Sequence, residues 1–312
     1  MNEYEITTII TTYNAEWKQL KKTVVSAIKQ KNLKHQIIVS DDGSDNNYFK
    51  ELEKLFKMYL FTEYILLDAS QNEGTCRNLY KALIKTKSLY CKAIAPGDYY
   101  FSDDTLYKWL DKAISLDSAI CFGETACYQN IDRPKTVSIF RAPQNVKIYD
   151  SAYDFKAAYL NYIFLDDAIW GCSVLLKTNI MKKYLGNALT FLKYAEDMVY
   201  RIMIVDGMKV VHFNEPVVWY DYGTGISTNG SSKWARILEQ EKEKTIKYII
   251  HNNKLKGLTR IRLDIGLNII GSKNMKFAKY LIYPELIYWK MKKNRIKACT
   301  SSKYNLDYIR NL

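Results

Sequence analysis

At 312 residues and 48% hydrophobic composition, the chain is long enough to bury one large core and to carry an extension beyond it. No stretch of about 18 apolar residues occurs, so we expect no membrane-spanning helix, and the first residues lack the pattern of a signal peptide. Only three histidines are present and the six cysteines form no CxxC pair. These counts argue against a zinc site and a disulfide framework, and they favour a reducing cytoplasm.

The net charge of +13 is concentrated near the C-terminus. Residues 251–312 contain 14 Lys and Arg against 3 Asp and Glu, whereas the first 250 residues contain 32 basic and 30 acidic ones. A basic segment of this kind attracts anionic surfaces such as phospholipid, nucleic acid or a phosphate-rich polymer.

The first part of the chain alternates between strand and helix patterns. Apolar and β-branched runs predict strands at 6–12, 36–40, 64–67 and 90–95. Apolar residues at helical spacing predict helices at 17–30, from Gly74 onward, and at 103–116. This alternation predicts an α/β fold with a Rossmann-like, mostly parallel central sheet flanked by helices.

Beyond residue 118 the pattern is looser. We expect strands at 119–122, 137–140, 173–176, 210–213 and 217–220, and helices at 153–162, 178–185 and from Tyr194 onward. A loop rich in Gly, Ser and Thr at 223–232 is typical of a domain boundary. A C-terminal extension of helices follows, predicted at 233–251, 255–270 and 273–297, with Pro284 kinking the last one.

Polar residues gather where four of the predicted strands end. These residues are Thr12, Tyr13 and Asn14; Asp41 and Asp42; Asn72, Gly74 and Arg77; and Asp98 after a Pro-Gly turn. The carboxyl ends of parallel strands share one edge of the sheet, where ligands of such folds bind. Carboxylates that accept from a base, an arginine for phosphate and an acid for a metal suit a nucleotide diphosphate. Each site alone could be an ordinary turn, but four together are harder to explain that way.

In their order along the chain, these motifs resemble those of family 2 glycosyltransferases, which are inverting enzymes of the GT-A fold. The resemblance covers roughly residues 5–230. It includes Thr12-Tyr13-Asn14, the Asp41–Asp45 run, Asn72-x-Gly74 with Arg77, and Asp98. It continues with Glu196-Asp197 followed by Arg201, and with the segment 220–228, which is similar to the closing donor-site loop.

The resemblance implies a role for each matching residue. Thr12, Tyr13 and Asn14 would line the nucleoside pocket, Asp42 would accept from the uracil N3–H, and Asp41 would support the turn. Asn72, Gly74 and Arg77 would lie near the base or diphosphate, and Lys233 or Ser227 could close over it. Asp197 would be the general base, with Glu196 as the alternative, unless Asp197 and Arg201 form only a helix ion pair. The acceptor pocket would include Asp166, Trp170 and Gly171, although Trp170 could equally be a core residue.

The metal site departs from the family pattern. Family members usually carry an Asp-x-Asp cluster where this chain has Ala95 and Gly97, so Asp98 stands alone. One carboxylate binds Mn²⁺ or Mg²⁺ weakly unless phosphate oxygens complete the coordination. We therefore expect the divalent metal to be held mainly by the nucleotide.

The resemblance also implies three parts and a set of partners. The parts would be a nucleotide-sugar-binding half (1–100), an acceptor-binding half (101–230) and a basic helical extension (231–312). The donor would be a nucleotide-diphosphate sugar, expected to be a UDP-sugar. The acceptor would be a glycan or lipid-linked glycan in bacterial cell-surface or capsular polysaccharide synthesis.

We expect a cytoplasmic protein, which would lie on the inner face of the cytoplasmic membrane if the helices of the basic extension bind anionic lipid. They could instead form a homo-oligomer interface. Nucleic acid is not expected as a partner, because no known reader motif occurs. Two other functions stay open: an inactive nucleotide-sugar-binding homologue, and a sugar nucleotidyltransferase. The latter carries a Gly-rich loop with a basic residue after its first strand, unlike residues 12–15 here.

Overall fold

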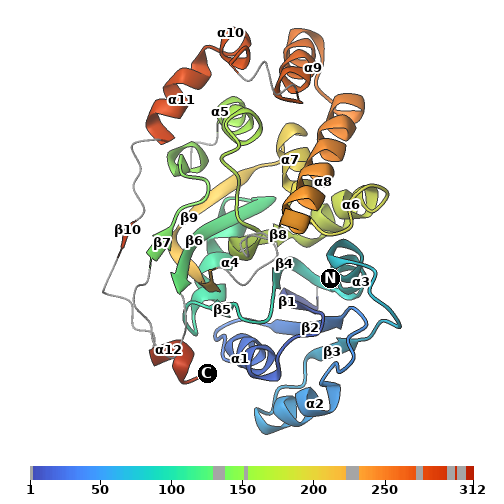
Figure 1. Cartoon of the computed structure of the whole chain (residues 1–312). Helices are drawn as coiled ribbons and strands as arrows, with labels where there is room; N and C mark the ends of the chain where they lie inside the picture. Colours follow the sequence, from blue (N-terminus) through green and yellow to red (C-terminus); the bar gives the residue numbers. More distant parts are fainter. Residues whose placement is uncertain are drawn as a thin grey trace.

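The computed structural model describes residues 3–128, 138–150, 154–222, 232–271, 277–293, 299–300 and 307–312. These residues form a ten-stranded sheet with helices on both faces and a group of helices at one end (Figure 1). The main strand order is β10-β7-β6-β8-β4-β1-β2-β3, and β9 joins β6 and β5 beside it.

The first four long strands form the predicted parallel, Rossmann-like half. Its elements are β1 (Tyr4–Thr12), α1 (Trp17–Ile28), β2 (His35–Asp41), α2 (Phe49–Met58), β3 (Tyr64–Leu67), α3 (Thr75–Lys85) and β4 (Ser88–Ile94). β1 lies between β2 and β4, and the register pairs Thr12 with Asp41 at the shared edge. Helix α2 was missing from the prediction.

Beyond β4 the sheet is mixed, because antiparallel strands join it. The elements here are β5 (Tyr99–Tyr100), α4 (Thr105–Ser115), β6 (Ile120–Tyr128), β7 (Ser138–Phe140), α5 (Phe155–Tyr159), β8 (Val174–Lys177), α6 (Thr178–Ala188), α7 (Met198–Val205) and β9 (Val210–Asp221). Short turns of 3-10 and π helix lie at Val146–Tyr149, Leu160–Phe164 and Gly171–Ser173. Where two strands were predicted at 210–220, β9 is a single strand with an irregular register to β6.

Side chains that alternate along the strands form two cores, one on each face. On β1, Ile6 and Ile10 pack toward α1, α2 and α4, whereas Ile9 packs toward α3, α6 and α7. All three isoleucines are fully buried. This burial on both faces explains why the central strands read as unbroken apolar runs.

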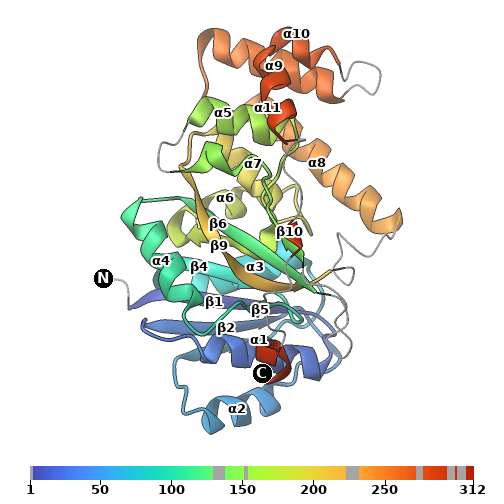
Figure 2. The ribbon, with the colours of Figure 1, turned by 90° about the vertical axis from the view of Figure 1, so that its left-hand side faces the viewer.

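The C-terminal extension begins with α8 (Ser232–Asn252), which packs on α7. It continues with α9 (Gly257–Gly271), α10 (Lys279–Ile282) and α11 (Glu285–Lys293), which lie at the end of the molecule away from α2 (Figures 1 and 2). The predicted helix 273–297 is therefore wrong as one kinked helix. It is divided at Pro284, which follows α10 and cannot donate a helix hydrogen bond.

The end of the chain returns to the first half of the sheet. Strand β10 (Cys299–Thr300) pairs with β7, and α12 (Asp307–Arg310) lies beside α1 (Figure 1). The buried Lys22 ammonium donates to the carbonyls of Ile309 (2.6 Å) and Arg310 (3.1 Å). Among the described helices, none is both long and apolar enough to span a bilayer.

Candidate active site

Hydrogen bonds between the turn after β1 and the turn after β2 connect the ends of these two strands. Asn14 adopts the left-handed conformation (φ 46°). Its backbone N–H donates to the Ser44 hydroxyl (2.7 Å), and its side-chain oxygen accepts from the N–H of Asp45 (3.0 Å). The Thr12 carbonyl accepts from the N–H of Asp42 (2.9 Å). Two predicted nucleotide-binding segments therefore form one continuous edge.

The two aspartates of this edge have different partners. Asp41 accepts from the backbone N–H (2.7 Å) and the hydroxyl (2.6 Å) of Ser44, as expected of a residue that supports the turn. Asp42 reaches the next loop and accepts from the N–H groups of Glu73 (3.0 Å) and Gly74 (2.9 Å). Asp42 is 3% exposed. Its contact with uracil stays a prediction, and that contact would use oxygens that already hold this loop.

The remaining predicted nucleotide contacts surround this edge. Gly43 (φ +76°) lets the turn pass close to the neighbouring loop, since a Cβ there would lie 2.6 Å from the Gln71 backbone. Tyr13, Asn72 and Arg77 are exposed along the rim. They are available to a ligand, whereas the carboxylates of Asp41 and Asp42 already accept hydrogen bonds from the protein.

Asp98 lies on the Pro-Gly turn after β4, as the prediction placed it. Helix α1 holds this turn: the Thr23 hydroxyl accepts from the N–H of Gly97 (3.1 Å) and donates to the Asp98 carbonyl (2.9 Å). Asp98 is only 7% exposed. Burial raises the pKa of its carboxyl to about 7, and the charge of Lys92 opposes that rise.

Two residues near Asp98 were missed. Lys92 on β4 is fully buried; burial lowers its pKa to about 8, against the opposing effect of nearby acidic groups that include Asp98 and Glu196. A lysine inside an apolar strand is a readable signal, because an unpaired buried charge is costly. The other is Asp221 at the end of β9, whose backbone hydrogen-bonds to the Asp98 carboxylate. The sequence gives no local sign of that contact.

The family resemblance implies a divalent cation here. Among the described residues, no three His, Cys, Asp or Glu side chains could hold a metal ion by themselves. Asp98 supplies one carboxylate, and the charge of Asp221 is close enough to act on it. Mg²⁺ is commonly bound by one or two carboxylates together with substrate phosphates. These residues therefore fit a cation that arrives with a diphosphate.

Glu196 and Asp197 lie in a turn immediately before α7, and both are partly buried. Burial and the neighbouring Asp197 raise the pKa of Glu196 to about 8. Burial also raises the pKa of Asp197, against the lowering effect of the Arg201 guanidinium. Helix α7 starts at Met198, so the predicted start at Tyr194 is wrong: the segment 193–195 makes hydrogen bonds to a distant helix instead.

Of the predicted acceptor residues, Gly171 lies against this acidic pair, and Trp170 precedes it in the chain. A Cβ on Gly171 would be 3.5 Å from Oε1 of Glu196 and 3.7 Å from Cβ of Asp197. Trp170 is partly exposed and stacks with Phe140 (ring centroids 5.5 Å apart) and with Tyr222 (6.5 Å). The residue that precedes Gly171 thus contributes to an aromatic cluster.

Asp166, also predicted to line the acceptor pocket, is engaged in ion pairs instead. It forms ion pairs with Arg201 and with Lys242 of α8 (2.8 Å). Burial raises the pKa of Asp166, but the two cations outweigh burial and bring it down to about 2. Arg201 therefore pairs with Asp166 and only influences Asp197 through its charge.

Two further predictions concern the closing loop. Residues 223–231, including Ser227, lie outside the described residues, and Lys233 is exposed on α8.

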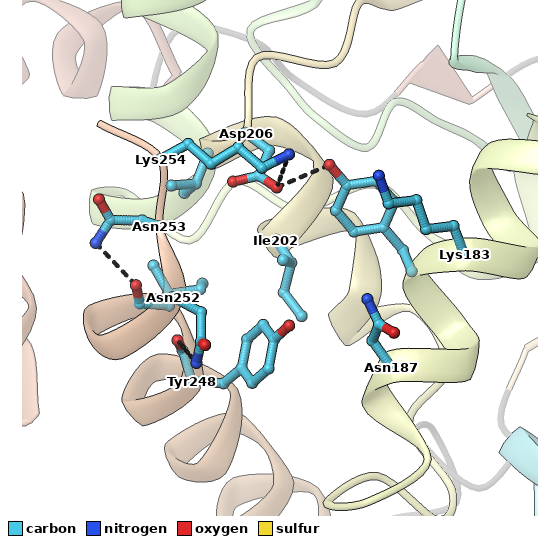
Figure 3. Close-up of a pocket in the computed structure, with 11 residues that line it drawn as sticks. Lys183, Asn187, Ile202, Asp206, Tyr248, Asn252, Asn253 and Lys254 are labelled. Carbon is cyan, nitrogen blue, oxygen red and sulfur yellow. Dashed lines mark hydrogen bonds and ion pairs between the residues drawn. The ribbon is translucent and has the colours of Figure 1, made fainter. Parts of the chain in front are cut away.

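A separate cavity of about 190 Å³ lies between α6, α7 and α8, lined by Tyr184, Asp206, Tyr248 and Lys254 among others (Figure 3). None of the predicted site residues lines it.

A parallel, Rossmann-like half that continues into a mixed-strand half, with acids at the junction, is the GT-A fold of glycosyltransferases. The family model described as "Glycosyl transferase family 2" matches residues 7–185, more than half of the chain. The protein therefore belongs to glycosyl transferase family 2 and is a glycosyltransferase.

Solved structures share this fold. S. aureus TarS residues 1–349 in complex with UDP-GlcNAc superposes with a TM-score of 0.60 at 14% identity, covering 92% of this chain and 79% of that chain. The same protein with UDP gives 0.59 at 13%, covering 91% and 78%. The mannosyltransferase PcManGT from Pyrobaculum calidifontis in complex with GDP-Man and Mn²⁺ gives 0.52 at 12%, covering 94% and 88%. A search of curated proteins finds no match.

Proposed function

We propose that this protein is an inverting glycosyltransferase that moves a sugar from a UDP-sugar to a hydroxyl of a glycan used in bacterial cell-surface polysaccharide synthesis. The observation that carries the proposal is the placement of Glu196, Asp197 and Gly171 together, with the partly exposed Trp170 next to Gly171 in the chain. The complexes of TarS with UDP and with UDP-GlcNAc support a UDP-sugar as donor.

The chemistry follows from the residue types. Asp197 takes the proton of an acceptor hydroxyl, and that oxygen forms a bond to the anomeric carbon from the face opposite the nucleotide. The bond between the anomeric carbon and the diphosphate oxygen breaks, its electron pair leaves with UDP, and the configuration inverts. A raised pKa suits a base that must accept a proton near neutral pH.

Other side chains would bind and orient the substrates. Thr12, Tyr13, Asn14 and Asp42 would hold the nucleoside at the edge formed by β1 and β2, and Arg77 would lie near the diphosphate. Trp170 offers an aromatic face to an acceptor sugar ring. A divalent cation bound at Asp98 would neutralise charge on the diphosphate.

A thermal-shift screen tests the donor class. A ligand that binds only the native state raises the melting temperature according to its concentration and Kd. We expect UDP with Mn²⁺ to stabilise the protein more than GDP, ADP or uridine do. Absence of stabilisation by every nucleoside diphosphate would contradict the proposal. Binding of UDP without release of UDP from any UDP-sugar would favour the inactive homologue.

We also propose that the extension docks on an anionic membrane. Its described residues expose large apolar side chains, among them Phe277 (81% exposed) just before α10 and Leu281 (85%) in α10. Leu258, Ile261 and Ile265 add an exposed apolar stripe along α9. The surrounding segment is strongly basic, so charge and apolar area both favour anionic lipid.

Vesicle flotation tests the membrane proposal. At low salt the protein should float with phosphatidylglycerol vesicles and stay in solution with phosphatidylcholine vesicles. The double variant Phe277→Ser, Leu281→Ser should float less, whereas Leu60→Ser, which changes an equally exposed leucine (88%) near α2, should behave as wild type. Wild-type protein that stays in solution with anionic vesicles would refute the proposal.

A further inference from the structure

Three successive backbone amides next to the proposed base all donate to one carboxylate. The N–H of Lys193 donates to Oε1 of Glu241 (2.9 Å), that of Ala195 to Oε2 (2.7 Å), and that of Tyr194 to both oxygens (3.1 and 3.2 Å). Glu241 lies on α8 and is 4% exposed. It therefore belongs to the C-terminal extension, outside the matched residues 7–185.

The same segment also touches the edge predicted to bind the nucleotide, which comprises residues 12–14, 41–45 and 72–77 and is here called the nucleotide edge. The Lys193 carbonyl accepts from the N–H of Cys76 in the first turn of α3 (3.0 Å). Gly74 packs so closely on Lys193 that a Cβ would lie 2.5 Å from its Cγ and 2.7 Å from its carbonyl oxygen. Gly74 in turn donates to Asp42. Residues 193–195 are thus packed between the predicted uracil-binding aspartate and the acids Glu196 and Asp197.

Glu241 supplies the hydrogen-bond acceptor that the backbone amides of residues 193–195 need. Residues 193–195 lie in neither a helix nor a strand, so regular secondary structure does not satisfy their backbone amides. A row of backbone N–H groups forms an anion-binding nest, and bonds to a carboxylate are stronger than neutral ones. Without this carboxylate, three donors would lose their partner and the turn that carries the acids could shift.

We propose that Glu241 is a positioning residue: from the C-terminal extension it holds Lys193–Ala195, and thereby keeps Glu196 and Asp197 against Gly171 and the donor site. This inference rests on the proposed function, because it assigns Glu241 to the same reaction. Correct placement of the base then depends on α8, so the extension contributes to catalysis as well as to any membrane contact.

Glu241 affects the acidic pair both through its charge and through its hydrogen bonds, and the loss of each would change the pH–rate profile differently. Its negative charge raises the pKa of both Glu196 and Asp197. Neutralising it should move the acidic limb of the pH–rate profile to lower pH, while loss of positioning lowers kcat at every pH. The other charged and titratable groups that act on this pair are Lys92 on β4, Arg201 and Tyr200 on α7, Tyr162 before it and Cys76 on α3.

The test compares Glu241→Gln with Glu243→Gln, which removes the same charge from an exposed position two residues further along α8. UDP release from UDP-GlcNAc is followed as a function of donor concentration and pH. We expect kcat of Glu241→Gln to fall about 10- to 100-fold, as for a misplaced catalytic group. The donor KM should change little, the acidic limb should shift to lower pH, and Glu243→Gln should match wild type.

Hydrogen exchange gives a second measurement that does not depend on activity. The amides of residues 193–195 should be protected in wild type and in Glu243→Gln, and should exchange faster in Glu241→Gln. Glu241→Asp keeps the charge on a shorter side chain and should give intermediate protection and rate. It also serves as the test variant if Glu241→Gln does not fold.

The outcomes separate the two proposals. If wild type releases no UDP from any UDP-sugar, the proposed function fails, and hydrogen exchange still decides whether Glu241 holds the turn. Unchanged kcat in Glu241→Gln, or unchanged exchange at 193–195, would overturn the positioning role. So would a loss of kcat that matches a loss of UDP binding and melting temperature, because that pattern indicates general destabilisation.

Discussion

The nucleotide edge and the acidic pair are built in different ways. At the nucleotide edge, turns that follow consecutive strands bind one another: Asn14 binds the turn at Ser44, and Asp42 binds the loop at Gly74. The pair Glu196–Asp197 is instead surrounded by distant parts of the chain, including Gly171, Lys92 and, through the preceding residues, Glu241. The geometry of the nucleotide edge is therefore set by turns that follow consecutive strands, whereas the geometry of the acidic pair depends on contacts with distant parts of the chain.

The largest expected effect separates chemistry from nucleotide binding. Asp197→Asn removes the proposed base and should lower UDP release about 10²- to 10⁴-fold, while UDP still raises the melting temperature. Glu196→Gln should cost less. The control is Asp111→Asn, which changes an exposed acid of α4. Near wild-type activity in Asp197→Asn would transfer the role of base to Glu196.

The next prediction concerns the nucleotide edge alone. In Gly43→Ala the residue keeps a left-handed φ and its Cβ meets the Gln71 backbone, so unfolding free energy should fall by about 2–3 kcal/mol, with loss of UDP stabilisation. Gly207→Ala is the matched control, since φ is also positive (+83°) but the added Cβ would meet no heavy atom within 4 Å apart from its neighbours in the chain. It should cost about 1 kcal/mol and leave UDP binding intact. Equal effects in denaturant melts would show that the close approach to Gln71 is unimportant.

A smaller effect tests the acidic pair through pH. In the native protein the pKa of Glu196 is about 8 against an ordinary 4.5, so between these values the native state binds a proton that the unfolded state releases. The resulting contribution of Glu196 to the free energy of unfolding is fully present below about pH 4.5 and is lost as pH rises toward 8. Glu196→Gln should flatten the fall in unfolding free energy by about 1 kcal/mol or more. Parallel curves for wild type and variant in urea melts would contradict the raised pKa.

The smallest effect concerns the aromatic surface. Trp170→Ala should reduce transfer to glycan acceptors about 3- to 10-fold, because a stacking face is lost. Hydrolysis of the donor by water should change less. Tyr107→Ala, which removes an exposed aromatic side chain of α4, is the control. If transfer and hydrolysis fall together, Trp170 supports the fold rather than an acceptor.

The sequence predicts most of the first region because its signals are local. Apolar runs mark β1 to β4, with β3 predicted at its observed bounds, and Pro96-Gly97 marks the turn that presents Asp98. Helix α2 was readable too, since Leu52, Leu55 and Phe56 follow a helical spacing.

The second region could not be derived in the same way. The segment before α7 donates hydrogen bonds to Glu241, some 45 residues further along the chain. The partner of Arg201 is Asp166 and not the nearby Asp197, and α12 returns to α1 from the opposite end of the chain. Such contacts follow from the tertiary fold, and no local pattern encodes them.

The stereochemistry of donor hydrolysis tests the central claim most directly. With an α-linked UDP-sugar as donor, a single displacement with Asp197 as base must first release the β-anomer of the free sugar. We predict that proton NMR, recorded before mutarotation, shows UDP and the β-anomer of the free sugar with wild type and neither product with Asp197→Asn. Initial release of the α-anomer, or equal rates in both proteins, would contradict the account.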